Sequence, residues 1–150
     1  MFKNILFVCV GNICRSPMAE YWARAQLQKL GLIDAHVSSA GISNVMQGLP
    51  AAKETQIILN RFDINVSAHA ARHIDKNIVQ KADIIFVMET WQKKELSVVF
   101  SGSHGKIFPL GQWMNSEITD PYRKDQAAFE TTFELIKENW EIWQSKLWCY

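Results

Sequence analysis

Cys9 and Arg15, separated by five residues near the start of the chain, are the side chains best placed to do chemistry. The apolar run 5–8 precedes them and Ser16-Pro17 follows, so this segment is expected to join a buried strand to the start of a helix. The first N–H groups of a helix lack partners, and successive N–H groups in a tight turn form a nest for an anion. Phosphate is the natural guest of such a nest.

The two side chains have complementary roles in this nest. Arg15 offers a planar fork of donors that can bind two phosphate oxygens at once. Surroundings of this kind lower the pKa of a thiol into the range of about 3.5–7.5, so Cys9 is expected to be a thiolate at neutral pH. Ser16 can donate its hydroxyl to the sulfur, and a thiolate beneath a bound phosphate is a nucleophile for phosphoryl transfer.

Each residue also has a plainer interpretation. Taken singly, Cys9 fits a buried apolar side chain and Arg15 fits a surface cation. Gly11 and Asn12, which tolerate left-handed backbone angles, lie between them at the same junction of strand and helix. The combination favours the phosphate site.

Asp120, in the triplet Asp120-Pro121-Tyr122, is the best candidate for a general acid. A tyrosine leaves as a phenolate whose conjugate acid has a pKa of about 10, so a proton donor helps its departure. Pro121 stiffens the backbone beside the carboxyl group, and Tyr122 offers a flat face for a phenyl ring. An Asp-Pro pair alone is a common turn signal, and its weight comes from the loop around Cys9. Arg15 and the loop amides carry the charge, so the pattern requires no metal ion and no cofactor.

Other sites and protein classes fit the sequence poorly. The loop is neither a glycine-rich dinucleotide fingerprint nor a Walker loop, and Cys9 and Cys14 lack the spacing of a zinc site. The formal charge is +1 without a basic stripe, which argues against nucleic-acid binding. The run 5–10 is too short to span a membrane and lacks the flanks of a signal peptide. The odd number of cysteines, three, does not suggest a secreted disulfide framework, so a cytoplasmic protein is expected.

Strands and helices are expected to alternate along a single domain of residues 1–150. Apolar runs predict strands at 5–8, 37–40, 84–88 and 106–108, and helices are predicted at 16–30, 51–62, 90–99 and 125–147. The alternation predicts an α/β fold, with a doubly wound, four-stranded parallel sheet and helices on both faces. In such sheets ligands bind beyond the carboxyl ends of the strands, at the switch point.

The first and last helices have the most specific signals. Ser16 is expected to cap the first helix and Gly31 to stop it. Its apolar side is expected to carry Met18, Trp22 and Ala25. Six apolar residues of the last helix follow the helical period and form one face: Phe129, Phe133, Ile136, Trp140, Trp143 and Leu147.

Four sets of motif residues are spread over nearly the whole chain: the segment 8–17 with Ala19-Glu20, the triplet Ser39-Ala40-Gly41, His69 with Arg72, and Asp120-Pro121-Tyr122. Together they resemble the low-molecular-weight protein tyrosine phosphatases. The stretch 118–124 resembles the bacterial branch, whose members act on autophosphorylated tyrosine kinases that control capsule or exopolysaccharide export. The resemblance implies the phosphotyrosine phosphatase I-like fold and hydrolysis of phosphotyrosine through a cysteinyl-phosphate. The expected partner is a tyrosine-phosphorylated protein, a bacterial tyrosine kinase, and the expected state is a monomer or weak dimer.

The resemblance also implies roles for individual residues. Cys9 is the nucleophile, Arg15 binds phosphate and Asp120 is the acid, while Ser16 supports the thiolate. Substrate contacts are expected on the loop and at two further positions: Val10, Gly11, Asn12, Ile13, Cys14, Ser16, Val45 and Tyr122.

Supporting roles follow for residues around the loop. By the resemblance, Asn12 adopts a strained left-handed conformation anchored by Ser39 and His69, and His69 pairs with Glu20. A solvent-exposed loop histidine is the alternative for His69. Cys14 is implied to bond reversibly with Cys9 under oxidation, and a buried thiol packed under the loop is also compatible with the sequence.

The chain departs from the family pattern around the expected substrate. Val45-Met46 stand where many relatives present an aromatic residue, and Arg123 stands where eukaryotic members often have a second tyrosine. The preferred peptide sequence is therefore left open. Trp113 is expected either to line the same crevice or to belong to the core.

Two other functions are compatible with parts of the pattern. One is arsenate reductase on the same scaffold, but that reaction needs further cysteines, and none lies between Cys14 and Cys149. The other is a phosphotyrosine-binding module without catalysis, which has no use for a proton donor such as Asp120.

Overall fold

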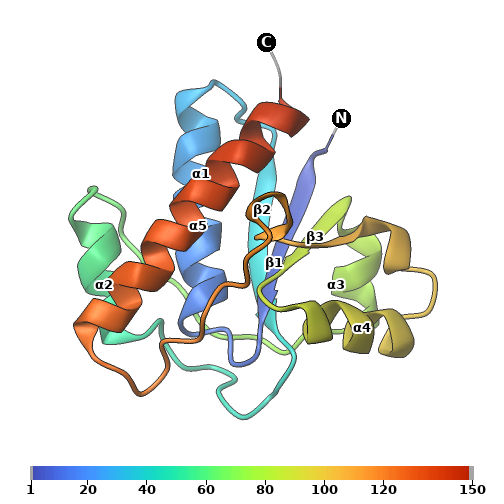
Figure 1. Cartoon of the computed structure of the whole chain (residues 1–150), viewed down its shortest axis with the longest axis horizontal. Coiled ribbons are helices and arrows are strands. Elements are labelled where there is room, and N and C mark those ends of the chain that lie inside the picture. The colour runs from blue at the N-terminus through green and yellow to red at the C-terminus, as the bar shows by residue number, and fades with distance from the viewer. Residues whose placement is uncertain (1, 149–150) are drawn as a thin grey trace.

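A parallel sheet with the strand order β2-β1-β3-β4 forms the centre of the molecule (Figure 1). The computed structural model describes residues 2–148, so Cys149 lies outside the described residues. The strands are β1 (Asn4–Cys9), β2 (His36–Gly41), β3 (Ile84–Val87) and β4 (Ile107–Pro109). In the register of the sheet, Cys9 pairs with Gly41 of β2, and Val8 pairs with Val87 of β3. The expected four-stranded parallel sheet is confirmed.

Helices cover both faces of this sheet (Figure 1). They are α1 (Arg15–Lys29), α2 (Lys53–Asn60), α3 (Lys76–Lys81), α4 (Thr90–Val99) and α5 (Gln126–Leu147). Successive side chains of a strand point to opposite faces. Accordingly Ile5 and Phe7 pack with α1, α2 and α5, whereas Leu6 and Val8 pack with α3 and α4. The doubly wound arrangement is therefore confirmed.

Helix α5 forms the longest apolar face. Phe129, Phe133, Ile136, Trp140 and Trp143 are buried along it, as their spacing predicts. Asp125 caps the start, because its carboxylate accepts from the N–H of Ala128 at 3.0 Å. The segment before this helix, which includes Asp120, lies at the carboxyl end of the sheet.

The start of α1 differs from the sequence prediction. The helix begins at Arg15 with Cys14 as its cap residue, and Ser16 lies inside the first turn. The Ser16 hydroxyl lies 2.9 Å from the Cys9 sulfur instead of capping the helix, so the prediction of a Ser16 cap is wrong. The apolar side is also shifted, since Met18 is fully buried whereas Trp22 and Ala25 are only partly buried.

Some short elements were missed or shortened. Helix α2 spans 53–60 instead of 51–62, because Ala52 has extended backbone angles and Asp63 has a positive φ. The six-residue helix α3 is too short to show a helical period, and the same holds for the 3₁₀ turns His104–Lys106 and Gln112–Met114. Gly31, with φ 77, ends α1 as expected.

The switch point of the sheet lies between β1 and β3, the two central strands. Their carboxyl ends gather four segments that are far apart in the sequence: 9–15, 42–50, 88–90 and 118–122. Trp113 is not among them, because it packs half-exposed against Trp143 at 5.4 Å. Within residues 2–148, no helix has both the length and the apolarity needed to cross a membrane.

Candidate active site

Cys9 ends β1, and its buried sulfur faces the turn that leads into α1. The N–H of Asn12 donates to this sulfur at 3.3 Å. Ser16 Oγ lies 2.9 Å from the sulfur and already accepts from Asn12 Nδ2 at 2.8 Å. Because Asn12 supplies that proton, the Ser16 hydroxyl proton is free to point at the sulfur. The loop thus directs two donors at Cys9.

Asn12 holds the loop from behind. Its φ is 58, and its Nδ2 donates to Ser39 Oγ at 2.8 Å as well as to Ser16. Its Oδ1 accepts from the N–H of Arg72 at 3.0 Å, and its carbonyl oxygen accepts from His69 Nε2 at 2.7 Å. His69 is therefore a buried partner of the loop rather than an exposed histidine.

The expected pairing of His69 with Glu20 is wrong. One oxygen of Glu20 accepts from Ser39 Oγ at 2.5 Å, and the other accepts from Arg24 one turn later on α1. Both carboxylate oxygens are thus engaged by closer donors. The polar chain from the loop runs from Asn12 through Ser39 to Glu20 and does not pass through His69.

Arg15 is 1% exposed and lies among anionic and carbonyl oxygens. Its Nη1 donates to Glu89 Oε2 at 2.9 Å and to the carbonyl oxygen of Ile118 at 2.9 Å. Its Nη2 lies 3.6 Å from Asp120 Oδ2. A buried cation requires such partners, because burial without them is strongly unfavourable. The guanidinium group is therefore oriented before any ligand binds.

Glu89 is a site residue that the sequence analysis missed. It follows β3 and is fixed by Gln92, whose Oε1 accepts from the N–H groups of Met88 and Glu89 at 2.8 and 3.0 Å. Gln92 itself is fully buried. The sequence position of Glu89 could have indicated its role, because a carboxylate just after a central buried strand lies at the switch point of the sheet.

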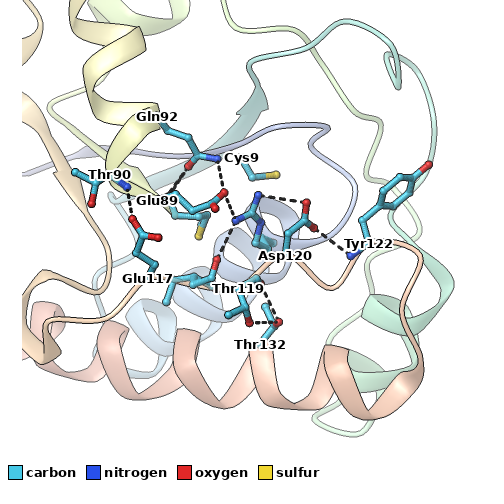
Figure 2. A network of polar contacts seen from close by, with 12 residues as sticks. Cys9, Glu89, Thr90, Gln92, Glu117, Thr119, Asp120, Tyr122 and Thr132 are labelled. Atoms are coloured by element: carbon cyan, nitrogen blue, oxygen red, sulfur yellow. Dashed lines mark hydrogen bonds and ion pairs between the residues drawn. The ribbon is translucent and has the colours of Figure 1, made fainter.

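Asp120 reaches the loop from the far end of the chain. Its Oδ1 accepts from the N–H of Tyr122 at 3.0 Å (Figure 2), and its Oδ2 faces Arg15. Thr132 of α5 donates to the carbonyl oxygen of Thr119 at 3.0 Å, which ties this segment to the helix. The side chain is 46% exposed, so the carboxyl group is accessible to a ligand and to water.

These groups meet at a cavity of about 190 Å³. Its lining residues come from the loop and from two rims: Cys9, Val10, Gly11, Ile13, Cys14, Arg15, Ser43, Val45, Met46, Asp120 and Tyr122. Asn12 and Ser16, expected to contact substrate, are instead buried outside this lining. Ser43 and Met46 line the cavity although they were not among the expected substrate contacts.

Cys14 lies in the cavity wall as a neutral thiol. Burial, followed by the nearby charges of Cys9 and Asp120, raises the pKa of Cys14 to about 12. Cys9 and Cys14 are both free. A disulfide between them stays a prediction.

The comparisons with known proteins agree with this geometry. The family model of the low molecular weight phosphotyrosine protein phosphatases matches residues 4–148. The chain belongs to this family. The family expected from the sequence motifs is thus confirmed, and the phosphatase family's bacterial members provide close comparisons.

Two bacterial tyrosine phosphatases and one solved structure illustrate the similarity. The low molecular weight protein-tyrosine-phosphatase Ptp of Acinetobacter johnsonii is 41% identical over 136 residues, which cover 91% of this chain and 92% of that protein. The probable phosphatase EpsP of Ralstonia nicotianae is 37% identical over 147 residues, covering 98% and 97%. The structure of Vibrio vulnificus Wzb in complex with benzylphosphonate matches with a TM-score of 0.90 at 32% identity, covering 98% of this chain and 100% of that chain.

Replacement of Glu89 is expected to destabilise the fold, because it removes an anionic partner from a buried cation. For Glu89→Ala we expect the free energy of unfolding to fall by about 2–4 kcal/mol in urea denaturation, and by less for Glu89→Gln, which keeps an acceptor. Glu117→Ala is the control, because within residues 2–148 this exposed carboxylate accepts from the N–H of Thr90 and forms no hydrogen bond or ion pair with Arg15. Equal losses for Glu89→Ala and Glu117→Ala would contradict the role given to Glu89.

The raised pKa of Cys14 predicts slow alkylation in the folded state. At pH 8, roughly one Cys14 side chain in ten thousand is a thiolate if its pKa is about 12. In a Cys149→Ser background, iodoacetamide should leave Cys14 unlabelled in the native protein and label it in urea, as peptide mass analysis would show. Labelling of native Cys14 at the rate of the unfolded chain would refute the prediction.

Proposed function

We propose that this protein hydrolyses phosphotyrosine through a covalent cysteinyl-phosphate, with Cys9 as nucleophile, Arg15 as phosphate ligand and Asp120 as general acid. One observation carries the proposal: the sulfur, the guanidinium group and the carboxyl group all line a single cavity. The site has the three components of phosphoryl transfer, namely a nucleophile, a fixed positive charge and a proton donor.

In the first step, the Cys9 thiolate attacks the phosphorus atom of the bound phosphate group. An S–P bond forms, the P–O bond to the tyrosine ring breaks, and Asp120 delivers its proton to the departing phenolate oxygen. Arg15 and the loop N–H groups stabilise the charge on the phosphoryl oxygens. The hydroxyl of Ser16 stabilises the sulfur before the attack, consistent with its position 2.9 Å away.

In the second step, water replaces the enzyme sulfur. Asp120, now a carboxylate, takes a proton from the attacking water, the S–P bond breaks, and Cys9 leaves as a thiolate with inorganic phosphate as product. Because Asp120 is 46% exposed, water has access to it once the phenol has departed.

The walls of the cavity suit an aryl phosphate. Val45 and Met46 form an apolar rim on one side, and Tyr122 belongs to the other. Val45 and Tyr122 are exposed, and such surfaces favour contact with a phenyl ring. Many relatives present an aromatic residue at 45–46, where this chain has Val45 and Met46. The phenyl ring of the substrate therefore rests mainly against Tyr122.

The physiological substrate that we propose is an autophosphorylated bacterial tyrosine kinase of polysaccharide export. The resemblance of 118–124 to the bacterial branch and the similarity to bacterial tyrosine phosphatases support this assignment. We also propose that the enzyme acts in the cytoplasm as a monomer or weak dimer. Trapping with a Cys9→Ser variant tests the assignment, and capture of other phosphoproteins without any tyrosine kinase would contradict it.

The two alternative functions gain no support from the geometry. Cys9 and Cys14 are the free cysteines within the described residues, so no further thiol stands ready to carry oxidation away, as arsenate reduction requires. A binding module would not need a carboxyl group 3.6 Å from the phosphate ligand Arg15, where it competes with phosphate for the cation.

Cys9→Ser is expected to abolish hydrolysis of aryl phosphates, because a serine hydroxyl is not ionised at neutral pH. The hydroxyl keeps the contacts to Ser16 and to the N–H of Asn12, so the thermal unfolding transition should be retained. The measurement is steady-state hydrolysis of phosphotyrosine, with calorimetric binding of a phosphotyrosine peptide as the test of an intact cavity. Residual turnover near the wild-type rate would rule out the covalent mechanism.

Asp120→Ala is expected to slow turnover according to the leaving group. For phosphotyrosine, whose phenol has a pKa of about 10, the loss should reach about 100-fold or more, and for a strongly acidic phenol it should be much smaller. Asp125→Ala is the matched control from the same segment, since that carboxylate caps α5. Equal losses of Asp120→Ala on both leaving groups would remove Asp120 from the role of acid.

A further inference from the structure

Two exposed cations come directly after a residue of the cavity lining. Tyr122 belongs to the cavity lining, and Arg123 and Lys124 follow it directly. The guanidinium carbon of Arg123 lies 5.4 Å from the centre of the Tyr122 ring. Both side chains are exposed, and neither forms an ion pair with any residue of the range 2–148.

The backbone holds these cations at the rim. Arg123 has φ 63, and the N–H of Lys124 donates to the carbonyl oxygen of Pro121 at 2.9 Å, which closes a turn. Pro121 is buried, and the turn leads directly into the cap of α5. The fold therefore sets the backbone position of both residues relative to Tyr122, and the contact with the Tyr122 ring also places the guanidinium group of Arg123.

The acidic side chains of the same segment are already engaged. Asp120 accepts from the N–H of Tyr122 and faces Arg15, and Asp125 accepts from the N–H of Ala128. The opposite rim, 42–50, contains no charged residue. These hydrogen bonds leave both carboxylates charged, and Asp125 follows Lys124 directly, so the cation that contacts the cavity residue Tyr122 is Arg123.

We propose that Arg123 and Lys124 form an anion subsite that selects phosphotyrosines flanked by a carboxylate or by a second phosphate. The proposal rests on the proposed function, because it specifies the substrate of that same cavity. Neighbouring residues of an extended peptide are about 3.3 Å apart along the chain, so a side chain one or two positions from the phosphotyrosine spans the distance from the Tyr122 ring to the subsite. Each exposed ion pair should strengthen binding by between about 1.4-fold and 5-fold.

The test compares peptides that differ only beside the phosphotyrosine. One peptide has Glu at the two positions on either side, a second has Gln there, and a third has one added phosphotyrosine. For the wild-type enzyme at low salt, the ratio of kcat/KM between the Glu and Gln peptides should be about 5, and it should fall towards 1 at high salt. The third peptide shows whether phosphate is preferred over carboxylate.

Variants assign the preference to the two cations. The ratio should fall below about 2 in the double variant Arg123→Ala/Lys124→Ala, and Arg123→Glu should favour a Lys-flanked peptide. The control Lys29→Ala/Lys81→Ala removes the same charge far from the mouth and should keep the wild-type ratio. Lys29 ends α1, about 21 Å along that helix from Arg15, and Lys81 precedes the amino end of β3.

The outcomes separate the two proposals. A wild-type ratio near 1, or a ratio that the double variant leaves unchanged, would overturn the anion subsite. Failure of the wild-type enzyme to hydrolyse any of the peptides would overturn the proposed function instead. Each ratio compares two peptides with the same variant, so a lower fraction of folded enzyme reduces both rates equally and leaves the ratio unchanged.

Discussion

The buried guanidinium group of Arg15 determines how distant parts of the chain must meet. A cation removed from water needs close anionic partners, and Arg15 finds them in Glu89 after β3 and in Asp120, with the carbonyl oxygen of Ile118 as a further acceptor. Arg15 follows β1 and Glu89 follows β3, and the two side chains can meet because these strands are parallel neighbours. An anion entering the cavity meets a cation that is already oriented, so little reorganisation accompanies binding.

A second constraint lies behind the loop, at Asn12. A left-handed conformation costs a residue of this type on the order of 1 kcal/mol, and here the hydrogen bonds to Ser16, Ser39, His69 and Arg72 offset it. These partners occupy the side chain and the carbonyl oxygen of Asn12 from outside the cavity. Its N–H can therefore point inward at the Cys9 sulfur. The hydrogen bonds that hold the loop 9–15 therefore come largely from residues behind it rather than from the loop alone.

Local patterns were sufficient where an element buries a continuous apolar stripe. The run 5–8 and the six-residue face of α5 identified β1 and α5 because their burial depends on periodicity alone. The prediction of a Ser16 cap failed because Ser16 serves the Cys9 sulfur, a use that helix statistics cannot show. The pairing of His69 with Glu20 failed because Arg24, one turn along α1, competes for the same carboxylate.

The sequence by itself predicts a phosphate-binding loop and determines its place in the fold, because Cys9 and Arg15 lie at one strand-to-helix junction. Tertiary structure alone decided which carboxylates would balance Arg15, because Glu89 is 74 residues away and its role depends on the order of the strands. It also decided that the guanidinium group of Arg123 lies against the ring of Tyr122, a residue of the cavity lining. Such pairings arise from packing between elements, and no short stretch of residues specifies them.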